Sequence, residues 1–383
     1  MTTPLLQPRI DEDVIRALPK AEVHVHLEGG FELIDLLDLA KAAGESLPGP
    51  ARSLFDLSTH DAQEHPEVTT GGAELGVGVG GLSGFLRFLD WECGLVRTPE
   101  DAARTAYRFA ARESASGVRY ADVVVNPTHW NAWRDRVPAL FDAFAAGLDE
   151  AAQDGLAEIG LCASLLRQQG AQESVEFVEW ILDARPRRVV ALSIDGDERA
   201  AGRTGSRFAD AFRRARDGGL RRTVHAGESS GPEGVWDAIR LLHAERIDHG
   251  VRAVEDPELV AFLADSDISL GVCPRSNLSL GVYADWSEHP LERLRSAGVA
   301  VTVNTDDPAP LGTRLEAEWA VCAESFGWTM DDVIELARAS VRASFAAPEL
   351  RRDLLSEIDG VAAARGWASE QEPGVQAGVG GTR

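Results

Sequence analysis

Two histidines near the start of the chain have the spacing of metal ligands. His24 and His26 stand one residue apart in the stretch EVHVHLEG, residues 22–29. In a β-strand the side chains alternate between two faces, so both imidazoles would point the same way. Neutral imidazoles so placed can hold one metal ion, but a catalytic zinc site needs further nitrogen or oxygen ligands and a position open for water. Those ligands must come from other parts of the chain.

Three later apolar runs end in residues that could complete such a site. One run leads into His225 and Glu228, another into His249, and a third into Asp306 and Asp307. Alone, each has a structural interpretation, because a histidine at a strand end is usually a hydrogen-bonded residue and Asp-Asp-Pro is common in turns and helix caps. Their shared position at the ends of apolar runs favours a metal site with acid and base groups beside it.

Apolar, β-rich runs alternate with amphipathic segments along the chain. Together with the histidine stretch they predict eight strands, the other seven being residues 119–126, 158–166, 189–194, 222–226, 246–248, 268–273 and 299–304. Helices are expected at about 31–43, 100–116, 137–154, 171–184, 206–218, 234–244, 257–265 and 290–297, with more helix from 314 onward. This alternation predicts an α/β fold, a (β/α)₈ TIM barrel with extra helices, in which reactive groups collect where strands end.

Charge and hydropathy limit the partners of the chain. The 38 basic and 62 acidic side chains give a net charge of −24, which repels polyphosphate and anionic membranes alike. We therefore expect neither nucleic acid nor a membrane as a partner. No apolar run reaches the roughly 18 residues of a membrane span, and the N-terminus lacks the basic start and apolar centre of a signal peptide. The expected location is the cytoplasm.

The chain is long enough for two domains, but α/β barrels of this length fold as one. We expect a single barrel domain over residues 1–367 and a disordered tail over residues 368–383, which show no periodicity.

Residues 76–81 match GxGxxG, but no strand precedes them, so they favour a flexible flap over a phosphate cradle. The four cysteines form no CxxC pair and are interpreted as buried, apolar-like residues.

Four short motifs resemble those of a known family. HVHLEG at 24–29, HAGE at 225–228, DHG at 248–250 and NTDDP at 304–308 look like the motifs of the adenosine and adenine deaminases in the amidohydrolase superfamily. The resemblance extends through residues 196–198, 85–91 and 230–233, and it covers roughly residues 18–350 in the right order. It implies a zinc-dependent hydrolase that removes ammonia from a purine.

Site roles follow from the resemblance, motif by motif. It implies one Zn²⁺ per chain, held by His24, His26, His225 and Asp306. Glu228 would pass a proton to purine N1, a task for which a dry pocket would raise its pKa.

Other residues would assist the reaction or hold the purine. His249 would orient the attacking water or take its proton, and Asp307 would accept a hydrogen bond from the purine. Gly196 would offer its backbone amide to the purine edge, although a turn glycine is the simpler interpretation of that residue alone.

The substrate divides the family, and the motifs here point both ways. Adenosine and deoxyadenosine are the expected substrates, because residues 85–91, Gly196-Asp197-Glu198 and Thr305 resemble the adenosine branch. Glu28 and Asp248 resemble the adenine branch instead, so adenine or another 6-aminopurine derivative is the alternative. A barrel that binds a nucleoside or a metal without turnover is the alternative of another class. Oligomeric state is left open.

Further substrate contacts are expected around the rim of the barrel. Glu28 could shorten the pocket. Phe85 and Phe88 resemble the apolar gate of the adenosine branch, and because the glycine-rich residues 76–84 precede it, this gate could open and close over the pocket as a lid. His129 could touch the group attached at purine N9. Its neighbour Trp130 could do the same or could only cover the edge of the barrel.

Overall fold

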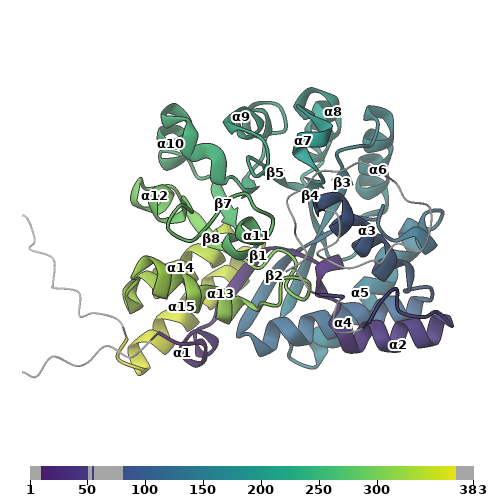
Figure 1. Cartoon of the computed structure of the whole chain (residues 1–383), viewed down its shortest axis with the longest axis horizontal. Coiled ribbons are helices and arrows are strands. Elements are labelled where there is room, and N and C mark those ends of the chain that lie inside the picture. Colours follow the sequence, from purple (N-terminus) through teal and green to yellow (C-terminus); the bar gives the residue numbers. More distant parts are fainter. Residues whose placement is uncertain (1–9, 51–53, 56–80, 368–383) are drawn as a thin grey trace, which may run out of the picture.

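A computed structural model describes residues 10–50, 54–55 and 81–367, with side chains from residue 84 in the last range. Eight strands pair in parallel and in chain order. They are β1 (Lys20–His26), β2 (Val118–Val125), β3 (Glu158–Leu166), β4 (Val189–Asp195), β5 (Arg221–Ala226), β6 (Arg246–His249), β7 (Ser269–Val272) and β8 (Val301–Val303). Figure 1 shows the helices arranged around these strands. The predicted (β/α)₈ barrel is confirmed.

Helices follow the strands on the outside of the barrel. Those between strands are α2 (Leu33–Ala43), α3 (Gly81–Gly94), α4 (Pro99–Ala115), α5 (Val137–Gln153), α6 (Ala171–Ala184), α8 (Gly205–Asp217), α9 (Pro232–Arg240), α10 (Pro257–Ala264) and α12 (Leu291–Ser296). The ends of the chain add α1 (Glu12–Ala17), α13 (Leu315–Phe326), α14 (Met330–Ala343) and α15 (Pro348–Ala364). Short helices lie just beyond strand ends: η1 (Glu28–Gly30), η4 (Asn131–Trp133), α7 (Glu198–Ala201), η5 (Val251–Glu255) and α11 (Pro274–Ser279).

Some predicted boundaries were wrong for local reasons. The first predicted helix begins at Leu33, two residues later than expected, because the Asp35 carboxylate accepts the backbone N–H of Glu32 at 3.0 Å and caps the helix there. The helix expected at 234–244 begins at Pro232, since proline suits the first helical turn, and it ends at Arg240. The predicted strands lie where expected, with ends shifted by a residue or two.

The barrel closes between β8 and β1 through a short seam. The backbone N–H of His26 donates to the carbonyl of Asp306 at 2.8 Å, and the N–H of Asp306 donates to the carbonyl of His24 at 3.3 Å. Below them, the Asn304 side-chain oxygen accepts the N–H of Val23 at 2.9 Å. Helix α14 packs against both strands and covers the seam from outside. Candidate metal ligands therefore stand on both sides of the seam.

A large hydrophobic core extends from Ile15 to Trp367, and a small second cluster is formed by Val124, Cys162 and Ala191. All four cysteines are free and buried, as predicted. Within the described ranges, no helix is long and apolar enough to cross a membrane. Most of the predicted glycine flap and the predicted disordered tail lie outside the described residues.

Candidate functional site

The predicted metal ligands and acid-base groups meet at the carboxyl ends of the strands. His24 and His26 come from the end of β1, His225 from β5 and His249 from the end of β6, and Asp306 follows β8. Because parallel strands of a barrel all end on one rim, residues up to 282 positions apart in the sequence come into contact there.

Three imidazoles and a carboxylate converge on one point. The Nε2 atom of His225 lies 3.1 Å from Nε2 of His24 and 3.0 Å from Nε2 of His26. Oδ1 of Asp306 lies 3.2 and 3.4 Å from the same two nitrogens of His24 and His26. Ligands about 2.05 Å from a tetrahedral zinc ion are about 3.3 Å apart. The four residues therefore have the spacing of one metal shell, and they form a group able to hold an ion.

The orientation of these ligands also suits a metal. Nδ1 of His24 lies 2.8 Å from the carbonyl of Gly271, which accepts its proton and directs Nε2 toward the shell. Despite burial, Asp248 and Asp306 raise the pKa of His24 to about 9, so a metal bound at Nε2 would displace a proton. Burial, with the nearby His24 and His26 rings, lowers the pKa of His225 well below its usual range, so that ring is neutral. Nδ1 of His225 faces Oδ2 of Asp248 at 3.4 Å. Asp248 therefore contacts His225 on the ring nitrogen that is turned away from the metal group.

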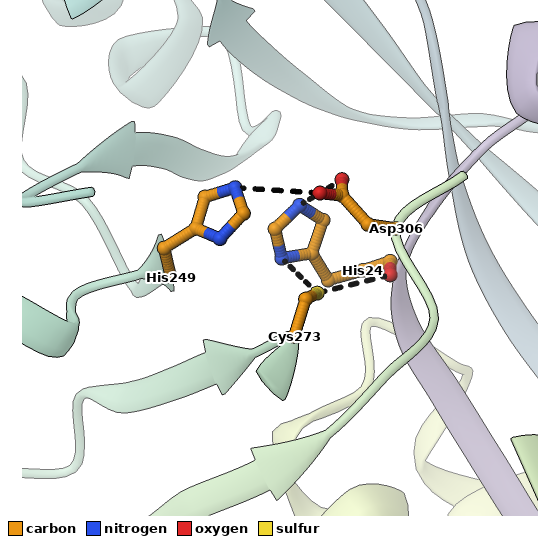
Figure 2. Close-up of side chains that lie close together, drawn as sticks. All are labelled: His24, His249, Cys273 and Asp306. Carbon is orange, nitrogen blue, oxygen red and sulfur yellow. Dashed lines mark hydrogen bonds and ion pairs between the residues drawn. The ribbon is translucent and has the colours of Figure 1, made fainter. Parts of the chain in front are cut away.

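A second possible metal group shares His24 and Asp306 but replaces two histidines by His249 and Cys273. Figure 2 shows Cys273 at one edge of the His24 ring and Asp306 at the opposite edge. The Cys273 sulfur lies 3.3 Å from Nδ1 of His24, the nitrogen already engaged by Gly271. Burial raises the pKa of the Cys273 thiol well above its usual range, whereas a metal binds the thiolate. The three-histidine group is the better shell.

Asp306 is held in an unusual conformation by its neighbours. Its φ angle is +66°, and that of His249 is +65°, a region that residues other than glycine rarely adopt. The Ser276 hydroxyl donates to Oδ2 of Asp306 at 2.6 Å, which leaves Oδ1 facing His24 and His26. Two strained residues at one rim are typical of a functional site.

Glu228 stands beside the metal group on a rigid loop. Its backbone N–H and those of Gly227 and Ser229 donate to the carboxylate of Glu198 at 2.9, 3.0 and 3.1 Å. Burial, with the charges of Asp306 and Glu198, raises the pKa of Glu228 to about 8. As the sequence led us to expect for a dry pocket, this carboxyl keeps its proton over much of the neutral range. It can therefore act as a proton donor.

Asp307 lies directly against the loop that follows β1. A side chain at Gly29 would place its Cβ 2.3 Å from Oδ1 of Asp307, so only glycine allows this approach. Oδ1 of Asp307 is buried, and no described residue forms a hydrogen bond with it. Burial and the charge of Asp306 raise the pKa of Asp307 well above its usual range. This oxygen is thus available to a ligand.

Glu28 is fixed by its neighbours at the end of β2. Its Oε1 accepts the backbone N–H of Asn126 at 2.8 Å and the indole N–H of Trp130 at 2.7 Å. Oε2 is buried and has no hydrogen-bond partner among the described residues. Trp130 is fully buried and packs on Phe144, with ring centroids 4.8 Å apart. Of the two interpretations of Trp130, the structure supports the covering role.

The remaining predicted substrate contacts have mixed surroundings. Phe85 and Phe88 are buried on α3, where Phe88 packs against Trp91 with ring centroids 5.7 Å apart. Nδ1 of His129 lies 2.7 Å from a carboxylate oxygen of Asp90. Gly196 has a φ angle of +96°, which explains the glycine without a ligand. A contact between any of these residues and a substrate stays a prediction.

Several polar residues of the site were not assigned from the sequence. Ser276 and Asn277 lie on α11, which follows β7, and they contact Asp306 and His249, respectively. Their place directly after an apolar run was a usable signal, by the same rule that found His225. Glu198 was recognised as part of a motif but was given no role, and its backbone partners could not be known without the structure.

Comparisons with known proteins place the chain in a family. A family model described as adenosine deaminase matches residues 19–361. The chain is 33% identical over 345 residues to an adenosine deaminase of Serratia proteamaculans, covering 90% of this chain and 98% of the relative. It is 33% identical over 349 residues to an adenine deaminase of Cupriavidus necator, covering 90% of this chain and 92% of that relative.

A solved structure extends the likeness to the fold. An amidohydrolase from Burkholderia ambifaria with bound zinc has a TM-score of 0.79 and 27% sequence identity, over 95% of this chain and 96% of the other. The resemblance noted in the four motifs is therefore confirmed. The chain belongs to the adenosine deaminase family, and it is a hydrolytic deaminase that acts on a C–N bond of a purine.

Proposed function

We propose that this deaminase acts on adenosine and deoxyadenosine at purine C6, releasing ammonia and the corresponding inosine, and that it depends on zinc. The observation that carries the proposal is the position of a protonated carboxyl beside a metal shell. Glu228, with a pKa of about 8, has Oε1 3.6 Å from Nε2 of His249, which itself faces the ligand Asp306. The proton donor can then act on purine N1 while water is added at the neighbouring atom, C6.

The metal would be one Zn²⁺ per chain. His24, His26, His225 and Asp306 would hold it, as their mutual spacing suggests. When bound, zinc lowers the pKa of a coordinated water and so supplies a nucleophile near neutral pH. The remaining chemistry belongs to the side chains.

Glu228 makes the substrate reactive. An amine on an aromatic ring is a poor leaving group, so C6 must become tetrahedral before ammonia can depart. The Glu228 carboxyl donates its proton to N1, which draws electrons from C6 and favours addition of the water oxygen there. Ammonia leaves as the C6–N bond breaks, and the 6-oxo purine remains. The water supplies two protons, one that restores the Glu228 carboxyl and one that leaves with the amine as ammonia, so water and substrate together account for every atom of the two products.

Asp307 and Gly196 would orient the purine ring. Oδ1 of Asp307 has no hydrogen-bond partner among the described residues, which supports a pairing with a ring nitrogen that carries or shares a proton. Gly196, whose φ angle is +96°, would offer its backbone amide to the purine edge. Two contacts to a planar ring fix its rotation, and C6 is then presented to the attacking oxygen.

Adenine is the second candidate substrate, and Glu28 is the observation that favours it. The carboxylate is fixed by Asn126 and Trp130, and its buried Oε2 has no hydrogen-bond partner among the described residues. This oxygen could accept either a ribose hydroxyl or an N–H of the free base. The adenosine and adenine deaminases compared above are both 33% identical to this chain and do not decide between the two.

Ammonia release from a substrate panel tests the proposal. Zinc-loaded protein would be assayed with adenosine, deoxyadenosine, adenine and larger 6-aminopurine derivatives. We expect adenosine and deoxyadenosine to have the highest kcat/KM. Turnover of adenine alone would replace the proposed substrate by the free base. Tight binding of a nucleoside with no turnover of any compound would leave only a binding protein.

We also propose that residues 1–367 act as a single domain. The large core from Ile15 to Trp367 supports this proposal.

A further inference from the structure

We propose that Asn277 and His289 hold His249 in the tautomer whose proton is on Nε2, so that His249 donates a hydrogen bond into the site and does not accept a proton there. The tautomer follows from the hydrogen bonds of this chain. The role of this tautomer in catalysis rests on the proposed function. Asn277 and His289 are positioning residues in this proposal, since they act through His249.

The argument starts at a backbone amide, a group that can only donate. The N–H of Leu291 donates to Nδ1 of His289 at 3.3 Å. Nδ1 of His289 is therefore an acceptor and carries no proton. His289 is buried, and burial lowers its pKa to about 4, so the ring is neutral at pH 7. A neutral imidazole with a bare Nδ1 must carry its proton on Nε2.

That proton determines which way the amide of Asn277 points. Nε2 of His289 lies 3.1 Å from Oδ1 of Asn277, which accepts the hydrogen bond. A reversed amide would place its NH₂ group against the N–H of His289, so two donors would face each other. Asn277 is fully buried, and its NH₂ group therefore points to the other side, where Nδ1 of His249 lies 3.4 Å away.

Nδ1 of His249 must then be the acceptor. An amide NH₂ can only donate, so Nδ1 of His249 carries a lone pair, and the proton of the ring is on Nε2. The same contact excludes the doubly protonated ring, because its Nδ1–H would face the NH₂ donors. The N–H of Leu291 can only donate, and three consecutive hydrogen bonds therefore determine which atoms of His289, Asn277 and His249 donate and which accept.

The surroundings of Nε2 agree with a proton at that position. Figure 2 shows this nitrogen of His249 facing the carboxylate of Asp306. Oδ2 of Asp306 lies 3.8 Å away and Oε1 of Glu228 lies 3.6 Å away. The Asp306 carboxylate can accept a hydrogen bond from a proton on Nε2, whereas a lone pair there would face its negative charge. An atom placed between these groups, such as the oxygen of the attacking water, receives a hydrogen bond from His249.

The consequence concerns the role of His249. The sequence left two roles open, orienting the water or taking its proton. A nitrogen that already carries a proton cannot take another one, so the orienting role remains. Removing the Nδ1 donor should change this role even though Asn277 does not touch the substrate.

Nitrogen NMR of the zinc-loaded, full-length protein tests the tautomer directly. Histidine rings would be labelled with ¹⁵N, and the signals of His249 would be identified by their loss in His249→Phe. We expect Nε2 of His249 to show a bonded proton and Nδ1 to show a lone pair. In Asn277→Asp, a carboxylate replaces the NH₂ donor and accepts the proton of Nδ1, so the two signals should exchange character. His243→Asn, which removes a histidine whose Nε2 lies near the exposed Arg216, is the matched control and should change nothing at His249.

Kinetics supply the second measurement. Asn277→Asp should lower kcat by about 10²-fold with KM nearly unchanged, because a hydrogen bond made to the developing transition state is lost. A wild-type His249 with its proton on Nδ1, or an Asn277→Asp spectrum like that of wild type, would overturn the inference. If no purine is turned over but the tautomer is as stated, the proposed function fails and the hydrogen-bond assignment stands.

Discussion

Glu228 illustrates how a carboxyl becomes an acid near neutral pH. Its ordinary pKa would leave it ionised, but burial and the neighbouring charges of Asp306 and Glu198 raise the pKa to about 8. Glu198 has a second effect, since it accepts four consecutive backbone N–H groups, those of residues 227–230, and fixes the loop that carries Glu228. Despite the cost of burial, Arg167 and these backbone donors keep the pKa of Glu198 below its usual range. The Glu198 carboxylate thus stays ionised, and its charge helps to keep the Glu228 carboxyl protonated.

Glu228→Gln should separate metal binding from proton transfer. The amide keeps the size of the side chain but cannot give up a proton, so we expect normal zinc content and a kcat lower by about 10²- to 10⁴-fold. In wild type, kcat/KM should fall as pH rises through about 8, where Glu228 loses its proton, and this limb should be missing in the variant. The matched control is Glu233→Gln, the same substitution at an exposed side chain on α9. A variant with near-normal kcat would remove Glu228 from the mechanism.

Helix α11 connects the two sides of the site. It begins right after β7 and presents Ser276 to Asp306 and Asn277 to His249. Neither side chain is charged, yet one fixes which oxygen of Asp306 faces the histidines and the other fixes the proton of His249. Such partners of metal ligands determine the orientation of a site as much as the ligands do.

Ser276→Ala should weaken metal binding without removing a ligand. The Ser276 hydroxyl is a hydrogen-bond donor to Oδ2 of Asp306, and its loss frees the carboxylate to rotate. Removing such a partner commonly lowers metal affinity by about 10- to 100-fold, which competition with a zinc chelator would measure. Ser279→Ala at the end of the same helix is the control. Equal affinity in Ser276→Ala and wild type would show that Asp306 is positioned by other contacts.

The long elements could be predicted from the sequence, but the short ones could not. Runs such as 158–166 and 171–184 carry clear periodicity, because one face of each must be buried. Helices of four to six residues, α7 and α11 among them, are too short to show a period. Residue types at strand ends indicated a metal site, and the resemblance to the family supplied its four ligands. The contacts of Glu28 could not be predicted, since one of its two partners is a backbone N–H of Asn126, a group that every residue except proline carries.

At the level of the whole barrel, the site and the closing seam are the same place. His24 and His26 lie on β1, Asp306 follows β8, and His225 lies on β5 across the barrel. The seam itself has few backbone hydrogen bonds, and the side chain of Asn304 supplies the partner for Val23. A metal ion bound by all four ligands would therefore join strands that the sheet connects only weakly.

Zinc should consequently stabilise the fold as well as the active site. An ion that binds only the folded state adds about 4 kcal/mol at 1,000 times its Kd, so a chelator should lower Tm and added zinc should restore it. Asp306→Asn and His225→Ala should lose most of this increment.

Asn304→Ala provides the contrasting variant for that experiment. It leaves the buried N–H of Val23 without its partner, at a cost of about 1–3 kcal/mol, but it keeps all four metal ligands. We expect a lower Tm both with and without zinc, and a zinc-dependent increment close to that of wild type. Calorimetry or thermal unfolding followed by circular dichroism would measure both. If zinc raised the Tm of His225→Ala as much as that of wild type, the ion would be binding elsewhere, and the connection between the metal shell and the seam would be wrong.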